Sequence, residues 1–220
     1  MRYDGRHWKE RQLMMETGRL FPQNETLRSI DERHSVRVFI DKPVPEEHIG
    51  AILHAANQAP SAHNQQSWRF IIVKGEKKND LARLVSSRAG DFPRPAAALL
   101  RMAARSIDSA PVVIAVANTG QLIAHGTDLF KISMESAHDF FRTMEIQNSA
   151  AAAENLLVAA TSLGLATVWL GILFLIRDEV LNFLGEPQGE FMAVIPVGYA
   201  ARPSTGPKKV PLEKVVKHLQ

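Results

Sequence analysis

The densest run of hydrogen-bonding side chains lies between residues 59 and 68, which read Ala-Pro-Ser-Ala-His-Asn-Gln-Gln-Ser-Trp. Carboxamides both donate and accept hydrogen bonds and stay neutral at every pH, so such a run suits a planar ligand with several polar edges. Pro60 ends the apolar helical segment before it, because proline lacks an N–H and restricts the preceding residue. A turn then presents the polar groups of Ser61, His63, Asn64 and Gln66, as turns often do in binding sites. The alternative is a polar connection whose side chains only cap neighbouring elements.

Two further groups of residues could bind an anion. Arg33, Ser35 and Arg37 alternate along the chain, which places them on one side of an extended segment, and guanidinium groups match phosphate oxygens well. Lys208 and Lys209 lie in a proline-bounded segment near the C-terminus and could hold a phosphate as point charges. Each group alone also fits a solvated surface. Together with the amide loop, they favour a phosphorylated aromatic heterocycle as ligand.

Hydrophobic periodicity and breaker residues predict the elements that position these groups. We expect helices over residues 27–34, 44–58, 77–87, 95–107, 136–163 and 176–184, and strands over 68–73, 111–117, 166–170 and 191–199. Asn24 or Thr26 is available to cap the first helix, and Gly164 to end the longest one. Residues 119–131 lack periodicity and contain two glycines, so we expect a loop or lid. The pattern predicts an α+β fold with one mixed sheet covered by helices.

Composition narrows the class of protein. The chain has 220 residues, of which 45% are hydrophobic and 22% charged, as in an ordinary globular protein. It has no cysteine, which excludes thiol catalysis and cysteine-ligated metals. The net charge of +3 is dispersed, which argues against a nucleic-acid partner. The apolar stretches are too short to span a membrane and the charged N-terminus lacks a signal peptide, so we predict a cytoplasmic protein. The eight histidines show no metal-binding spacing, and we predict no metal.

Five segments in order resemble the nitroreductase family of FMN-dependent oxidoreductases, over about residues 28 to 217. The first two are the specific ones: Arg33-His34-Ser35-Val36-Arg37-Val38-Phe39 with Pro43-Val44, and Ala59 through Trp68. The other three are weaker: Ser109-Ala110-Pro111, then Glu154-Asn155-Leu156-Leu157-Val158-Ala159-Ala160 with Gly164-Leu165, and Val197-Gly198-Tyr199.

The resemblance implies a central mixed, mostly antiparallel sheet flanked by helices, in an intertwined homodimer with FMN at the interface. Residues 25–220 would form the FMN-binding domain, with an N-terminal arm at 1–24 and a C-terminal arm at 201–220. Arg33 and Ser35 would contact the ribityl phosphate and Arg37 the N1/O2 edge of the flavin, while the amide loop would come from the other subunit. The full set of implied cofactor contacts is Arg33, His34, Ser35, Arg37, Pro60, Ser61, Ala62, His63, Asn64, Gln66, Trp169, Leu170, Gly171, Lys208 and Lys209.

The implied activity is ping-pong hydride transfer from NAD(P)H through flavin N5 to a small electron-poor acceptor, such as a nitroaromatic or a quinone. No side chain is assigned as catalytic, because the cofactor carries the chemistry. Reductive dehalogenation, breakdown of the flavin itself and a non-catalytic flavin-binding module remain alternatives. Three residues depart from the family pattern: Ser67 stands where proline is usual, Glu154 where glutamine is frequent, and Lys209 where arginine is frequent. The N-terminal arm and the lid predicted over 119–133 fall outside the common core and would shape substrate choice.

Overall fold

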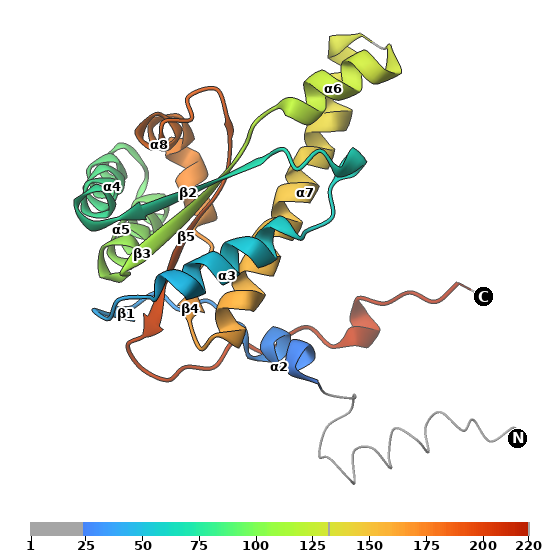
Figure 1. Ribbon diagram of the computed structural model, residues 1–220. Helices are drawn as coiled ribbons and strands as arrows, with labels where there is room; N and C mark the ends of the chain where they lie inside the picture. The colour runs from blue at the N-terminus through green and yellow to red at the C-terminus, as the bar shows by residue number, and fades with distance from the viewer. Residues whose placement is uncertain (1–23, 132, 220) are drawn as a thin grey trace, which may run out of the picture.

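The computed structural model describes residues 24–131 and 133–219, and it is built on one five-stranded sheet (Figure 1). The strands lie in the order β1-β5-β3-β2, and β4 also pairs with β5. Their bounds are β1 Phe39–Ile40, β2 Trp68–Lys74, β3 Val112–Asn118, β4 Ala166–Thr167 and β5 Glu190–Ala200. Every strand pair is antiparallel, and one isolated parallel bridge joins Ser35 to Thr167. The mixed, mostly antiparallel sheet predicted from the sequence is therefore confirmed.

The central strand β3 explains why the sheet needs cover on both faces. All seven of its residues are buried, as a continuous apolar run predicts for a strand packed on two sides. Val113 and Ala115 face a core that includes the helices α4 (Gly75–Arg88), α5 (Arg94–Ser109) and α8 (Arg177–Leu184). Ile114 and Val116 face the opposite core, which includes α3 (Glu46–Asn57) and α7 (Met134–Ser162). The result is a three-layer molecule (Figure 1).

Local signals set several helix ends as the sequence indicates. The helix α2 (Glu25–Glu32) is capped by Asn24, whose side chain accepts a hydrogen bond from the N–H of Leu27 at 2.9 Å. The helix α7 has 29 residues, or about 43 Å of length. Gly164 follows it with a φ of +71°, the left-handed conformation in which glycine ends helices.

Two sequence predictions are wrong. Residues 119–131, expected as a loop, contain the helix α6 (Gln121–Phe130). Its buried side is made by Leu122 and Gly126, and a glycine adds nothing to a hydrophobic pattern, so periodicity misses the helix. The strand expected over 166–170 ends as the two-residue β4, because the chain turns into the 3₁₀ segment η3 (Gly171–Ile176).

The C-terminal residues form an arm rather than part of a layer. Residues 201–219 are all exposed and carry only one 3₁₀ turn, η4 (Leu212–Lys214). The C-terminal arm expected over residues 201–220 covers this segment. The N-terminal arm predicted for residues 1–24 lies, apart from Asn24, outside the described residues. Within the described ranges, no helix combines the length and the apolar character that crossing a bilayer requires.

Candidate functional site

A basic cavity of about 550 Å³ lies between the end of α2 and the start of the C-terminal arm. Its wall is made by Asp31, Arg33, His34, Ser35, Arg37, Ser204, Thr205, Gly206, Pro207 and Lys209. The fold thus brings the alternating Arg33, Ser35 and Arg37 together with Lys209, which is far away in sequence. Lys208, predicted beside it, is not part of this wall.

The shape of the segment after α2 accounts for the alternation. Arg33 leaves the helix in an extended conformation, with φ −60° and ψ 122°. The N–H of Val36 then donates to the carbonyl oxygen of Thr167 at 2.9 Å, which fixes the segment beside β4. Because successive side chains of an extended segment point to opposite sides, Arg33, Ser35 and Arg37 share one side.

His34 ties the C-terminal arm to this segment. Its Nδ1 lies 2.7 Å from the carbonyl oxygen of Glu32, and its Nε2 lies 2.8 Å from the hydroxyl of Ser204. A carbonyl can only accept, so Nδ1 carries the proton. The arm also passes very close at Gly206, where an added Cβ would lie 3.0 Å from the Cβ of His34. The predicted site residue His34 therefore shapes the cavity wall.

Glu154 on α7 lies beside the basic cavity and contacts Arg33 of its wall. Its Oε1 lies 3.3 Å from the Nε of Arg33, whose side chain is 21% exposed while that of Glu154 is 51% exposed. An ion pair on Nε fixes the orientation of the guanidinium plane of Arg33. The same carboxylate also repels an anion that binds in the cavity. Three cationic side chains remain around the cavity against Asp31 and Glu154, so its charge balance still fits a phosphate group.

The amide loop forms a second, separate group of site residues. Its centre is the 3₁₀ turn η1 (Ala62–Asn64), and His63, Asn64 and Gln66 have positive φ values of 53°, 52° and 50°. Non-glycine residues in this region cost on the order of 1–3 kcal/mol each and gather at functional sites. Ser67, in place of the family's proline, leaves Gln66 free to adopt this conformation, because a proline there would drive residue 66 to an extended one.

Hydrogen bonds to the rest of the chain hold the strained loop. Asn148 of α7 accepts from the N–H of Ala62 at 3.2 Å, and the hydroxyl of Ser61 accepts from the N–H of Gln66 at 3.1 Å. Trp68 donates from its indole nitrogen to Asn57 at 3.0 Å. The ring of His63 lies 6.1 Å from that of His125 and 5.9 Å from that of Phe130, centroid to centroid. The loop is thus held between α6 and α7.

The helix α7 separates the loop from the basic cavity. The loop contacts Asn148, whereas Arg33 contacts Glu154. Six residues of helix correspond to about 9 Å along the axis and roughly 120° around it. Among the described residues that line the cavity, none comes from residues 59–66. The helices α6 and α2, near which the loop and the cavity lie, are at opposite ends of α7 (Figure 1). One chain therefore carries two groups of predicted site residues, here called half-sites, which lie on different sides of α7.

The predicted segment 169–171 is mainly structural in a single chain. Leu170 is buried in the core, and its N–H donates to the carbonyl oxygen of Val194 at 2.9 Å. Trp169 packs against the core around α3 and α7, and Gly171 is exposed. A cofactor could meet Leu170 only through its backbone.

Sequence reasoning missed Glu145, which is 1% exposed on α7. Its Oε1 accepts from the N–H of Leu122, in the first turn of α6, at 2.8 Å. Burial raises the pKa of this carboxyl, while the hydrogen bond from the N–H of Leu122 acts to lower it. The available signal was that Glu145 follows Phe141 by four residues and so lies on the same side of the predicted helix.

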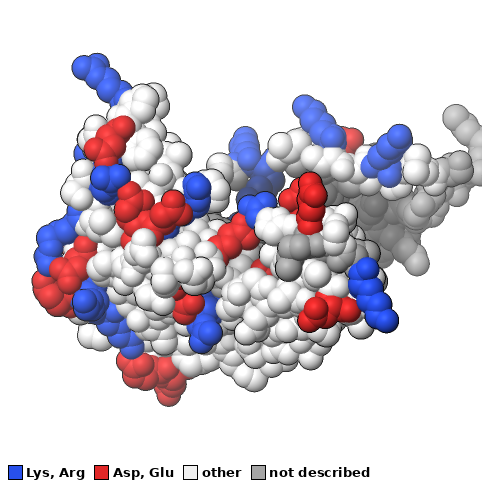
Figure 2. All heavy atoms as spheres, turned by 90° about the horizontal axis from the view of Figure 1, so that it is seen from above, with Lys and Arg blue, Asp and Glu red and all other residues white. Residues whose placement is uncertain are grey.

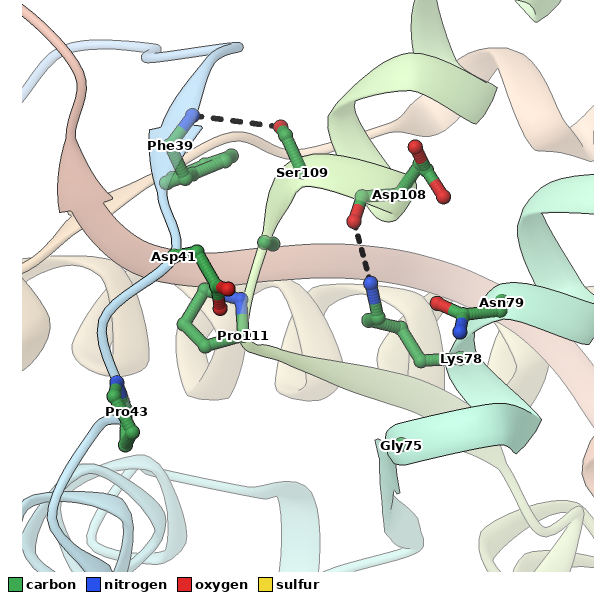
Figure 3. Close-up of a pocket in the computed structure, with 10 residues that line it drawn as sticks. Phe39, Asp41, Pro43, Gly75, Lys78, Asn79, Asp108, Ser109 and Pro111 are labelled. Carbon is green, nitrogen blue, oxygen red and sulfur yellow. Dashed lines mark hydrogen bonds between the residues drawn. The ribbon is translucent and has the colours of Figure 1, made fainter.

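A second cavity, of about 590 Å³, lies at the start of β3 and of α4 and holds none of the predicted cofactor contacts (Figure 3). There Lys78, which is buried, donates from Nζ to the backbone carbonyl oxygen of Asp108 at 2.5 Å. Asp41 and Asp108 contribute acidic side chains to the same wall. Although this cavity is the larger, its mixed charge suits a phosphate less well than the basic cavity does.

The charges elsewhere are mixed. On the face seen in Figure 2, basic and acidic side chains alternate without forming one basic stripe. In the part of the chain that the structure describes, no group of three or more histidine or acidic side chains is placed to hold a metal ion.

Comparison with known proteins gives concordant results. Residues 30–199 match the sequence model described as "Nitroreductase family". A "Putative NADH dehydrogenase/NAD(P)H nitroreductase" of Archaeoglobus fulgidus is 31% identical over 180 residues, which cover 80% of this chain and 85% of that protein. The "FMN reductase [NAD(P)H]" of Bacillus subtilis is 29% identical over 207 residues, covering 87% and 72% respectively. The solved nitroreductase of Desulfitobacterium hafniense, which has FMN bound, shares the fold with a TM-score of 0.69 at 24% identity, covering 90% of this chain and 100% of that one.

Proposed function

The chain belongs to the nitroreductase family, and from that premise we propose that it is an FMN-dependent oxidoreductase that uses NADH or NADPH to reduce a small electron-poor acceptor. The observation that carries this proposal is the convergence of Arg33, Ser35, Arg37 and Lys209 on one cavity. Relatives whose names include NAD(P)H nitroreductase and FMN reductase support it.

The residues around the basic cavity fit the phosphate end of FMN. Arg33 and Arg37 offer guanidinium donors, Ser35 offers a hydroxyl, and Lys209 adds a third positive charge from the arm. FMN, when bound, supplies the capacity to accept a hydride from a nicotinamide and to pass electrons to an acceptor. Arg37 would stabilise the negative charge that develops on reduction, since a cation held beside developing charge lowers its energy.

We further propose that the complete site needs two copies of the chain, with the amide loop of one facing the basic cavity of the other. The two half-sites lie on different sides of α7, so a single copy does not join them. The helix α2 and the arm, which both contribute to the cavity wall, also carry exposed apolar side chains, among them Leu27 and Ile30 at 40% and 47% and Val210 and Leu212 at 60% and 56%. Exposed apolar groups that lie together are typical of an interface.

The direct test is to purify the full chain and record its visible spectrum before and after adding FMN. We expect a yellow protein whose flavin absorption is bleached by NADH or NADPH under anaerobic conditions and restored by an acceptor. A colourless protein that takes up no FMN on reconstitution would overturn the proposal.

The same preparation separates the alternative functions. Reoxidation followed with a panel of nitroaromatics, quinones and halogenated phenols would identify the acceptor class and distinguish reductive dehalogenation. Loss of the flavin itself during turnover would indicate a flavin-degrading enzyme. Bound FMN that neither nicotinamide reduces would instead favour a non-catalytic flavin-binding module.

A further inference from the structure

Three side chains on one face of α7 contact two neighbouring segments, the amide loop and the helix α6. Phe141, Glu145 and Asn148 are spaced i, i+4 and i+7, which places them in one stripe of the helix. Asn148 accepts from the N–H of Ala62 in the amide loop. Phe141 packs under α6, where an added Cβ on Gly126 would lie only 2.3 Å from its ring. Glu145 lies between these two contacts.

The side chain of Glu145 caps the N-terminus of α6 from the neighbouring helix α7. The residue in the cap position is Gly120, which offers no side-chain hydrogen bond. The Oε1 of Glu145 instead accepts from the N–H of Leu122 at 2.8 Å. The first N–H groups of a helix have no partner within the helix, so an acceptor from α7 fixes where α6 begins.

The same carboxyl lies against the end of the amide loop. Ser67 is fully buried, and its carbonyl oxygen accepts from the N–H of Thr119, just before α6, at 2.9 Å. The Ser67 hydroxyl is close enough to act on the pKa of Glu145. Among the described residues, neither the Ser67 Oγ nor the Glu145 Oε2 has a hydrogen-bond partner. Both atoms are buried.

The geometry fits a neutral carboxyl better than a charged one. Among the described residues, no cationic side chain lies within salt-bridge distance of Glu145, and a buried carboxylate without a counter-ion is costly. A protonated carboxyl needs no counter-ion, and its Oε1 still accepts from the N–H of Leu122. The raised pKa of Glu145, whose largest cause is burial, agrees with this.

We propose that Glu145 is a positioning residue that holds α6 against the cofactor loop, and that ionisation of its buried carboxyl loosens this hold. The inference rests on the proposed function for what the loop binds. The direction follows from proton linkage: the closed arrangement raises the pKa of Glu145, so it binds the proton more tightly than an opened one. The hold of α6 is therefore strongest at low pH and weakens as pH rises through the pKa of Glu145.

Other ionisable groups lie on the elements packed around Glu145 and could produce a pH dependence of their own. On α7, Arg142 is paired with Glu190 of β5. Others are His63 on η1, His125 and Asp128 on α6, Lys131 after α6, and Glu135, His138, Asp139 and Glu154 on α7. A glutamine at position 145 removes only the titration of Glu145 and leaves all of these in place.

The test is amide hydrogen exchange of α6 in the full chain loaded with FMN, over a pH series and corrected for the intrinsic exchange rate. In the wild type, we expect the opening of α6 to increase as pH rises, in the direction that the raised pKa of Glu145 sets. Glu145→Gln should show slow exchange at every pH, because the amide keeps the hydrogen bond to Leu122 and carries no charge. Glu145→Ala should show fast exchange at every pH.

Glu135→Gln is the matched control, because Glu135 is an exposed glutamate in the first turn of the same helix. It should follow the wild type. In the loaded enzyme, the KM for the acceptor should show the same pH dependence as the exchange of α6, and Glu145→Gln should abolish it.

A wild-type exchange profile that is flat after correction, or a Glu145→Gln profile that tracks the wild type, would overturn the inference. If Glu145→Ala does not fold, the comparison of the wild type with Glu145→Gln still tests the role of Glu145. The visible spectrum of each sample reports FMN binding separately, so a failure of the proposed function is distinguished from a failure of the role of Glu145.

Discussion

Arg37 is the residue whose predicted role is most open to direct measurement. It lies on the same side of the extended segment as Arg33 and lines the basic cavity. Arg37→Ala should weaken FMN binding by about 1–3 kcal/mol, as for a lost charge-assisted hydrogen bond, and should lower the flavin reduction potential. The measurements are a fluorescence titration with FMN and a spectroelectrochemical potential.

The control for Arg37 is Arg101→Ala, which removes an exposed arginine of α5 from the other helix layer. That variant should leave both quantities unchanged. If Arg37→Ala also leaves affinity and potential unchanged, Arg37 has no part in the cofactor site.

Glu154, one of the three residues that depart from the family pattern, forms an ion pair with Arg33 in the folded chain. Its ion pair with Arg33 is half-exposed on the glutamate side, so it contributes only about 0–1 kcal/mol to stability. Its negative charge beside the cavity matters more for an anion. Glu154→Gln should therefore leave the melting temperature nearly unchanged and tighten FMN binding about two- to fivefold, within the range of such pairs.

Riboflavin, which lacks the phosphate, is the internal control for that variant. Its affinity should not change. An equal effect on FMN and riboflavin would place Glu154 away from the phosphate, and a weaker FMN affinity would mean that its orientation of Arg33 outweighs its charge.

At the scale of elements, the helix α6 depends on its packing against α7. Gly126 meets the ring of Phe141, where a Cβ would lie 2.3–2.4 Å from three ring atoms. Gly126→Ala should therefore destabilise the protein by about 1–3 kcal/mol through overpacking, although alanine is the better helix former. Urea unfolding followed by circular dichroism measures this difference.

Gly50 of α3 provides the matched comparison, because an added Cβ there meets nothing within 4 Å. Gly50→Ala should stabilise the protein by up to about 1 kcal/mol through helix propensity alone. Similar effects of the two substitutions would mean that α6 does not approach Phe141 as closely as described.

At the scale of the whole molecule, the two half-sites on different sides of α7 predict that cofactor binding is coupled to dimer formation. Dilution below the dimer dissociation constant should lower the FMN affinity, because a single copy offers only the basic cavity or only the amide loop to a given flavin. Sedimentation velocity and FMN fluorescence, recorded over the same concentration series, test this. FMN affinity that stays constant while the dimer dissociates would contradict it.

Much of the fold was predictable because local chemistry determined it. The β-branched run of β3 predicts a doubly buried strand, and Asn24 caps α2 through a contact three residues away. Arg33, Ser35 and Arg37 alternate in sequence and so share one side of any extended segment. The family signatures added the cofactor, the homodimer and the roles of individual residues, of which the dimer and the roles stay predictions.

What the sequence by itself determined are the features that depend on neighbours along the chain: the strands β2, β3 and β5, most helices, the shared side of Arg33, Ser35 and Arg37, and the polar turn of the amide loop. Only the tertiary structure decided the rest, because it depends on contacts between residues far apart in sequence. The helix α6 is stabilised by two contacts with α7: Gly126 packs against the ring of Phe141, and the N–H of Leu122 donates to Glu145. Lys209 reaches the cavity through the path of the arm, and α7 separates the two half-sites. Packing, rather than propensity, fixes each of these arrangements.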